Sequence, residues 1–219
     1  TVVALGKFDG MHKGHQLIFD ELIQYKQLGY QAAVFSFDRP PLNMLKHKHM
    51  RVIYTTNEKI KLLARRGIDI YIEHPFTDEF SHLSPEDFVI KVLLEKTGMK
   101  VLVVGDDCGF GYKRQGNVEL LERMSKEYDF KLIVIPKLEL EGEIVSSTRI
   151  RHLLSEGKVE EANRLMEDPF MICGSVVHGN HMGAEVLQMP TANQIPLEDK
   201  LLPPNGVYVS RIHYKDETY

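Results

Sequence analysis

Short apolar runs alternate with amphipathic segments along the first 135 residues of the chain. The apolar runs indicate buried strands, and the amphipathic segments carry apolar residues at helical spacing. The predicted strands span residues 1–5, 31–37, 68–73, 100–104 and 130–135, and the predicted helices span residues 14–28, 57–66, 84–98 and 118–127. Five alternations of this kind are typical of a parallel sheet with helices on both faces, so we predict a Rossmann-like α/β fold.

The pattern changes after two further predicted helices, at residues 148–155 and 159–166. Beyond Pro169 the chain carries short apolar segments separated by glycine and proline, and residues 173–177 and 206–212 are predicted strands. We interpret residues 1–167 as one domain and residues 168–219 as the beginning of a small β-barrel domain. About fifty residues are few for an independent hydrophobic core, so we expect the sequence to stop inside the second domain.

The composition limits the class of ligand. Hydrophobic residues make up 43% and charged residues 26% of the chain, as in an ordinary soluble protein, and no apolar run is long enough to span a bilayer. No leader precedes Thr1, and Cys108 and Cys173 lack metal-type spacing, so we expect a reducing, cytoplasmic location. The net charge of -4 disfavours a nucleic-acid binder. The expected partners are therefore small anions, bound by local cations and backbone N–H groups, and neither nucleic acid nor a membrane.

The strongest candidate site follows the first predicted strand, where residues 6–15 read Gly-Lys-Phe-Asp-Gly-Met-His-Lys-Gly-His. Gly6 and Gly10 allow the backbone to turn sharply and to approach a ligand closely. His12 and His15 share one face at the start of the first predicted helix. Two imidazoles at a helix N-terminus suit a triphosphate whose α-phosphorus is attacked. The alternative is a tight strand–helix turn whose histidines only cap the helix.

A second candidate site lies where residues 145–151 read Val-Ser-Ser-Thr-Arg-Ile-Arg. Ser147 or Thr148 can cap the helix that follows, which leaves other hydroxyl and N–H groups, such as those of Ser146, for an anion. Arg151 lies four residues after Ser147 on the same helix face, and its guanidinium can bind two phosphate oxygens in a forked geometry. The alternative is an ordinary capped helix with a solvated arginine.

These two segments resemble the two signatures of the nucleotidyltransferase superfamily, in the same order and at a similar separation. Among its members, the chain resembles most the adenylyltransferase module of the bacterial bifunctional riboflavin kinase/FAD synthetases. The resemblance implies that AMP passes from ATP to flavin mononucleotide (FMN), with Mg²⁺ as cofactor and with release of FAD and pyrophosphate. It implies catalytic roles for His12, His15 and Arg151. It also implies ATP or phosphate binding by Gly6, Phe8, Asp9, Gly10, Gly14, Ser146, Ser147 and Thr148.

Two loops after other predicted strands extend the resemblance. The family uses the loops that here read Phe-Ser-Phe-Asp (35–38) and Gly-Asp-Asp-Cys-Gly-Phe (105–110) to hold the flavin ring and the FMN phosphate. This implies FMN binding by Phe37, Asp107 and Phe110, although each phenylalanine is equally explained by core packing. The chain departs from the family at Arg39, where proline is usual, and at Cys108, where an aromatic residue is usual.

The tail resembles the start of the riboflavin kinase module. Residues 190–193, Pro-Thr-Ala-Asn, match a signature that helps to bind magnesium and ATP. The resemblance implies a kinase-like site at Pro190, Thr191 and Asn193, with Thr191 and Asn193 as metal ligands. The glycine-rich approach is irregular, because Gln188 stands where a second glycine is usual, and the catalytic glutamate of the family would lie beyond Tyr219. Kinase activity is therefore not predicted for the chain as given.

Two other functions stay open. One is adenylyl transfer to a different phosphorylated acceptor, and the other is flavin or nucleotide binding without catalysis. For the favoured reaction no general base is needed, because the attacking phosphate is already anionic. Catalysis then depends on alignment and on stabilising the charge that develops on the phosphates. The Lys-Arg pair at residues 113–114 is interpreted mainly as a solvent-facing turn, with a lid over pyrophosphate as the alternative.

Overall fold

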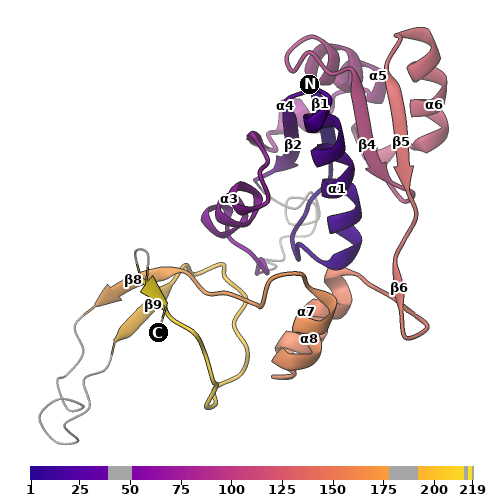
Figure 1. Cartoon of the computed structure of the whole chain (residues 1–219). Helices are drawn as coiled ribbons and strands as arrows, with labels where there is room; N and C mark the ends of the chain where they lie inside the picture. The colour runs from indigo at the N-terminus through magenta and orange to yellow at the C-terminus, as the bar shows by residue number, and fades with distance from the viewer. Residues whose placement is uncertain (39–50, 178–191, 215–216, 219) are drawn as a thin grey trace, which may run out of the picture.

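A five-stranded sheet forms the centre of the molecule. The computed structural model describes residues 1–38, 51–177, 192–214 and 217–218. The strand order is β3-β2-β1-β4-β5, and every neighbouring pair is parallel (Figure 1). The strands are β1 (Val2–Leu5), β2 (Ala32–Phe37), β3 (Ile70–His74), β4 (Val101–Gly105) and β5 (Lys131–Ile135). The predicted Rossmann-like α/β fold is confirmed.

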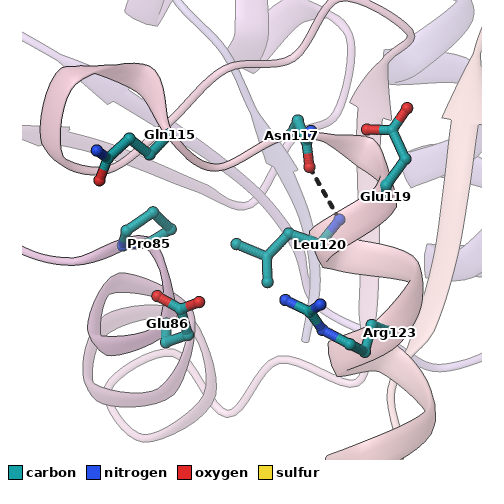
Figure 2. A pocket seen from close by; sticks show the side chains of 7 residues that line it. All are labelled: Pro85, Glu86, Gln115, Asn117, Glu119, Leu120 and Arg123. Carbon is teal, nitrogen blue, oxygen red and sulfur yellow. Dashed lines mark hydrogen bonds between the residues drawn. The ribbon is translucent and has the colours of Figure 1, made fainter.

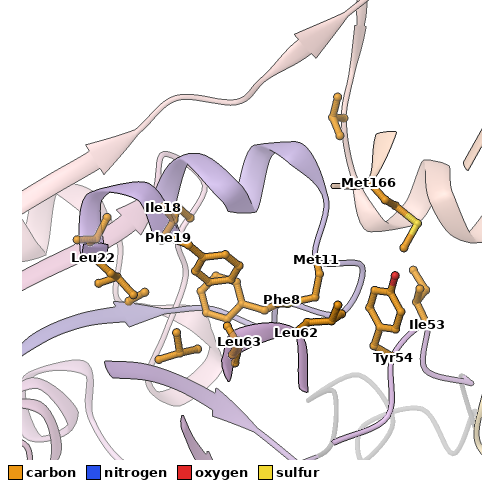
Figure 3. Close-up of a cluster of buried hydrophobic side chains, with 14 of the residues drawn as sticks. Phe8, Met11, Ile18, Phe19, Leu22, Ile53, Tyr54, Leu62, Leu63 and Met166 are labelled. Atoms are coloured by element: carbon orange, nitrogen blue, oxygen red, sulfur yellow. The ribbon is translucent and has the colours of Figure 1, made fainter. Parts of the chain in front are cut away.

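Helices cover both faces of this sheet, because successive residues of a strand point to opposite sides. In β1, Val2 and Ala4 belong to one buried cluster, while Val3 and Leu5 belong to another. Figure 3 shows the first cluster beside α1. Its face packs against α1 (Lys13–Gln27), α3 (Thr56–Arg65), α7 (Ser147–Ser155) and α8 (Val159–Leu165). The other face packs against α6 (Val118–Glu127) and the π-helix Phe88–Leu94, which continues α5 (Pro85–Asp87).

Side-chain caps begin the helices where the sequence indicates. Thr55 and Glu58 form a reciprocal capping box at the start of α3, and Ser84 caps α5 with Pro85 in its first turn. The helix predicted after Ser84 is present, although most of it has π-helical hydrogen bonding. The sequence pattern does not reveal three short elements: α4 (Asp78–Ser81) and the hairpin formed by β6 (Glu139–Leu140) and β7 (Glu143–Ile144).

The described part of the tail contains two small antiparallel pairs. They are β8 (Gly174–Val177) with β9 (Asn193–Pro196), and β10 (His213–Tyr214) with β11 (Glu217–Thr218). The strand predicted at residues 206–212 is wrong: these residues form no ladder, and Val207 and Val209 are fully exposed. A strand exists only where a neighbour completes its hydrogen bonds, and apolar alternation alone does not supply that neighbour.

The predicted beginning of a β-barrel is not confirmed, and the domain boundary at residues 167/168 stays a prediction. Within the described ranges, no helix combines the length and the apolar character that crossing a membrane requires.

Candidate active site

A large pocket lies where the strand order of the sheet reverses. β1 pairs with β2 on one side and with β4 on the other, and ligands of open parallel sheets bind at such a switch point. The pocket has a volume of about 910 Å³, and its lining includes residues that follow β1, β4 and β5. The predicted site residues that line it are Gly6, Phe8, His12, Gly14, His15, Phe37, Asp107, Phe110, Ser146 and Ser147.

The two predicted catalytic histidines lie against each other at the start of α1. Their rings are stacked, with 3.6 Å between centroids. His12 is the N-cap of the helix, and its Nδ1 accepts a hydrogen bond from the backbone N–H of His15 (3.3 Å). The Nδ1 atom of His15 is buried and has no hydrogen-bond partner among the described residues. An unsatisfied buried nitrogen at a pocket wall is a feature that a bound ligand would explain.

Burial keeps both imidazoles neutral near pH 7. It lowers the pKa of His12 to about 4, although the negative charge of Asp107 opposes this shift. The pKa of His15 lies well below the ordinary value, first because of burial and then because of His12. Each ring therefore carries one N–H donor in the free protein. A polyphosphate entering the pocket favours the protonated rings, because an opposite charge nearby raises the pKa of a histidine.

The loop before α1 has an unusual backbone. Phe8 and Met11 adopt positive φ angles of 47° and 44°, which are rare for residues with a side chain and persist only when the surroundings hold them. A Cβ atom on Gly6 would lie 2.7 Å from the Phe8 ring, and one on Gly14 would lie 3.1 Å from Nδ1 of His12. These two glycines therefore make room for side chains of the loop itself.

The second signature segment meets this loop directly. The backbone N–H of Gly10 donates to Oγ of Ser147 (3.3 Å), and the Arg151 guanidinium forms an ion pair with Asp9. Ser146 is the N-cap of α7, because its Oγ accepts from the N–H of Arg149 (3.2 Å). The prediction that Ser147 or Thr148 caps this helix is therefore wrong by one residue or more. Ser146 takes the N-cap position of α7, because its backbone is extended.

Four of the residues predicted for ATP binding or adenylyl transfer do not line the pocket: Asp9, Gly10, Thr148 and Arg151. Thr148 is exposed. The guanidinium of Arg151 contacts Asp9 and the carbonyl oxygen of Arg51, so in this structure it joins protein segments. The other carboxylate oxygen of Asp9 accepts from the N–H of Ile53 (2.9 Å). These contacts fix the first signature loop through Asp9, which does not line the pocket, whereas His12 and His15 do line it.

The far side of the pocket is aromatic. The ring of Phe37 lies 5.5 Å from that of Phe76 and 5.7 Å from that of Phe80, and all three line the pocket. Phe110 is almost fully buried and packs on Phe88, so core packing explains most of its contacts. Phe76 and Phe80 belong to the loop and short helix after β3, and no sequence motif marks them.

Cations that sequence reasoning missed or discounted also line the pocket. Lys113 and Arg114 lie in an exposed turn, as predicted, and this turn lines the pocket. Lys7 also lines the pocket; burial lowers its pKa most, and the positive charge of Arg114 lowers it further. Lys137 pairs with the carboxylate of Asp107 at 3.3 Å. A wall with several cations can bind polyphosphate, and the sequence signals for it are the position of Lys7 inside the first motif and the Lys-Arg pair at residues 113–114.

A smaller pocket of about 370 Å³ lies between α5 and α6 (Figure 2). No predicted site residue lines it, so it is not a candidate for the chemistry. Among the described residues no group of three or more His, Cys, Asp or Glu side chains could hold a metal ion. Of the kinase-like residues, Asn193 begins β9 and is exposed, whereas Pro190 and Thr191 lie outside the described residues.

The fold and the site together define a nucleotide-binding α/β enzyme of the nucleotidyltransferase type. Two family models match the chain: that of the FAD synthetases over residues 1–149 and that of riboflavin kinase over residues 166–219. The chain belongs to the FAD synthetase family.

Individual proteins agree with this assignment. A bifunctional riboflavin kinase/FMN adenylyltransferase from Buchnera aphidicola is 39% identical over 97% of this chain and 68% of its own length. The protein of the same description from Listeria monocytogenes is 36% identical over 100% of this chain and 69% of its own length. A crystal structure described as a macrolide-efflux protein from Streptococcus pneumoniae superposes with a TM-score of 0.86 at 32% identity, covering 100% of this chain and 71% of that one.

Proposed function

We propose that this chain is an FMN adenylyltransferase. An oxygen of the FMN 5′-phosphate attacks the α-phosphorus of ATP, the bond from that phosphorus to the bridging oxygen of the β-phosphate breaks, and FAD and pyrophosphate leave. The observation that carries the proposal is the meeting of the two signature segments beside one pocket, through the Gly10–Ser147 hydrogen bond and the Asp9–Arg151 ion pair. Membership of the FAD synthetase family supports FMN as the acceptor.

His12 and His15 act on the triphosphate. Their N–H groups stabilise the charge that develops on the α-phosphate and on the leaving pyrophosphate, and their stacking fixes both rings in one orientation. Ser146 and Ser147 bind phosphate oxygens from the opposite loop, while Gly6 lies next to the adenosine. Arg151 contributes by orienting the first loop through Asp9, and this role differs from that of a guanidinium free to bind phosphate.

The remaining pocket residues divide between the two ends of the substrates. Lys7 and Arg114 suit the pyrophosphate, because both line the pocket, their like charges repel, and a bound anion relieves the repulsion. Phe37, Phe76 and Phe80 suit the flat flavin ring, because aromatic side chains offer apolar surface at its faces and edges. Asp107 lies between these ends and holds Lys137 beside the FMN phosphate.

Magnesium enters with ATP, as part of the substrate. Mg²⁺ prefers phosphate oxygens and water, and it seldom occupies a site built from protein side chains alone. Its role is to neutralise the polyphosphate. The residues of this chain bind and orient the reacting groups.

Riboflavin phosphorylation is the second candidate function of the protein. The match of residues 166–219 to the riboflavin kinase model favours it. Within the tail, Asn193 and the segment before it would bind ATP and magnesium.

The expected partners are nucleotides and flavins. We infer a reducing compartment such as the cytoplasm, since Cys108 and Cys173 are both free thiols.

Pyrophosphate release tests the main proposal. The protein is mixed with ATP, magnesium and FMN, and parallel reactions replace FMN by riboflavin, phosphopantetheine or nicotinate mononucleotide. Release with FMN, accompanied by FAD, is the expected result. Release with another acceptor alone would make the chain a different adenylyltransferase. Thermal stabilisation by FMN and ATP without any release would make it a binding protein.

A further inference from the structure

A lysine from the tail is buried in the nucleotidyltransferase core. The side chain of Lys200 is inaccessible to solvent, and its ammonium forms an ion pair with Glu58 (2.7 Å). It also donates to the carbonyl oxygens of Ile53 (2.6 Å) and Met171 (2.7 Å), so all three of its N–H donors are used. Burying a charge is unfavourable unless it is paired and fully hydrogen-bonded, and this one is both.

Glu58 accepts hydrogen bonds from two backbone N–H groups in addition to that from Lys200. Its Oε2 also accepts from the N–H of Thr55 (2.8 Å) at the start of α3, and its Oε1 accepts from the N–H of Cys173 (2.7 Å) in the tail. One buried carboxylate therefore joins α3 to two separate tail segments. Tyr54 and Phe170 enclose the ammonium, with ring centroids 4.9 and 4.5 Å from Nζ.

The backbone beside this pair has two edges that face different parts of the protein. The N–H of Val52 donates to the carbonyl of Asp199, and the N–H of Leu201 donates to the carbonyl of Val52, both at 2.7 Å. On the opposite edge, the N–H of Ile53 donates to Asp9 (2.9 Å). The carbonyl of the preceding residue, Arg51, accepts from Arg151 on that same edge. Backbone groups of residues 51–53 therefore contact both the tail and the first signature loop.

That loop depends on outside contacts for its shape. Its positive φ angles at Phe8 and Met11 are costly, and the loop keeps them because Asp9 is held by Ile53 and Arg151. Ile53 and Tyr54 belong to the same buried cluster as Phe8 and Met11 (Figure 3). A shift of residues 51–53 therefore reaches Asp9 directly.

We propose that Lys200 is a positioning residue for adenylyl transfer: by fixing residues 51–53, it keeps the first signature loop in its ATP-binding shape. Through it the tail module sets the ATP affinity of the other module. This inference rests on the proposed function. It is specific for ATP, because Ile53 belongs to one buried cluster, whereas Phe37 and Phe80 at the aromatic end pack against the other.

The test compares Lys200→Met with wild type in steady-state FAD synthesis, using the full chain. Methionine keeps the length and apolar stem of lysine but removes the charge and the three donors. We expect the KM for ATP to rise roughly tenfold, the equivalent of about 1.4 kcal/mol, while the KM for FMN stays within about twofold. Hydrogen exchange at the backbone N–H groups of Ile53 and Gly10 should accelerate together.

Two further variants keep the test decisive. Glu58→Gln keeps an oxygen acceptor but removes the negative charge that pairs with Lys200. If Lys200→Met does not fold, the same change in the KM for ATP, without a change in the KM for FMN, is expected in Glu58→Gln. Lys26→Met is the matched control, because Lys26 also joins a carboxylate, Asp69, to a carbonyl, that of Gly67, but far from residues 51–53. The control should leave both KM values unchanged.

The outcomes separate this inference from the proposed function. A wild-type protein that makes no FAD contradicts the proposed function. Wild-type activity combined with an unchanged KM for ATP in Lys200→Met and Glu58→Gln contradicts the inference alone. An equal rise in the KM values for ATP and FMN would also contradict the inference, because a general loosening of the fold would raise both values.

Discussion

The two ends of the large pocket are built in different ways. The end that we assign to the phosphates is lined by residues of two short segments, 6–15 and 146–151. Each segment joins a strand or loop to a helix start and is held by named polar contacts. The end that we assign to the flavin consists of phenylalanines from separate elements, whose rings pack at steep angles to one another. The first end therefore has a fixed geometry for charged atoms, whereas the second offers apolar surface that tolerates some rearrangement.

The fixed polar geometry of the first end suits catalysis, and the apolar surface of the second end suits binding alone. Adenylyl transfer needs donors at set positions around the α-phosphate, because only contacts that strengthen in the transition state accelerate the reaction. The flavin ring takes no part in bond making, so its binding surface has only to hold it. Changes at the phosphate end should therefore act on kcat, and changes at the flavin end should act on the KM for FMN.

The largest expected effect is that of His15→Ala. Loss of a donor to the developing charge should lower kcat by roughly two to four orders of magnitude. The KM for FMN should change little, and pyrophosphate release measures both parameters. Near-normal turnover in this variant would remove His15 from the chemistry.

A pH titration of stability comes next. Because the pKa of His12 is about 4 in the folded protein and about 6.5 when unfolded, the unfolded chain binds the extra proton between these values. The contribution of His12 is therefore fully present above pH 6.5 and is lost as the pH falls towards 4, by at most about 3 kcal/mol.

His12→Asn isolates this contribution, because asparagine is also a good N-cap. Urea unfolding of both proteins at several pH values measures it. The wild type should lose more stability than the variant between pH 6.5 and 4. Parallel pH curves would show that His12 is not neutral and buried in solution.

Arg151→Met should have a smaller effect on stability. It leaves Asp9 without its cation in a mostly buried setting, and we expect a loss of about 1 to 3 kcal/mol, below that of a fully buried pair. Arg66→Met is the control, because the partner of Arg66, Asp20, is exposed, and it should cost less than about 1 kcal/mol. Equal stability of Arg151→Met and wild type would favour the phosphate-binding role that the sequence alone suggests.

Phe80→Ala should have the smallest effect and should appear only at the flavin end. Removing one ring from the aromatic group should raise the KM for FMN about threefold to tenfold, since such ring contacts are worth about 0.5 to 1.5 kcal/mol. The KM for ATP should not change. A fall in kcat without a change in the KM for FMN would mean that the two ends are not separate.

The sequence predicts the position of the first motif in the fold far better than it predicts the aromatic group of the pocket. The motif at residues 6–15 is local, and the strand and helix on either side of it are strongly patterned, so its position in the fold follows from the sheet topology. Phe76 and Phe80 could not be predicted, because their neighbours come from other elements and no spacing marks them. The Asp9–Arg151 ion pair spans 142 residues, and sequence reasoning assigned its arginine to the ligand.

The fold shows the same contrast. The five strands and main helices were predictable because each is buried on a face that its own periodicity defines. In the tail, the segment at 206–212 has the apolar alternation of a strand but pairs with no described residue. The burial of Lys200 could not be predicted either, since lysine side chains are almost never fully buried unless they are paired, and the sequence does not show the partner.

The central claim is that the two signature segments form one polyphosphate site. Hydrogen–deuterium exchange of the full chain, with and without a non-hydrolysable ATP analogue and magnesium, tests it most directly. The account predicts that the amides of residues 6–15 and 146–151 gain protection together, at the same analogue concentration. Protection of one segment while the other exchanges as in the free protein would contradict it.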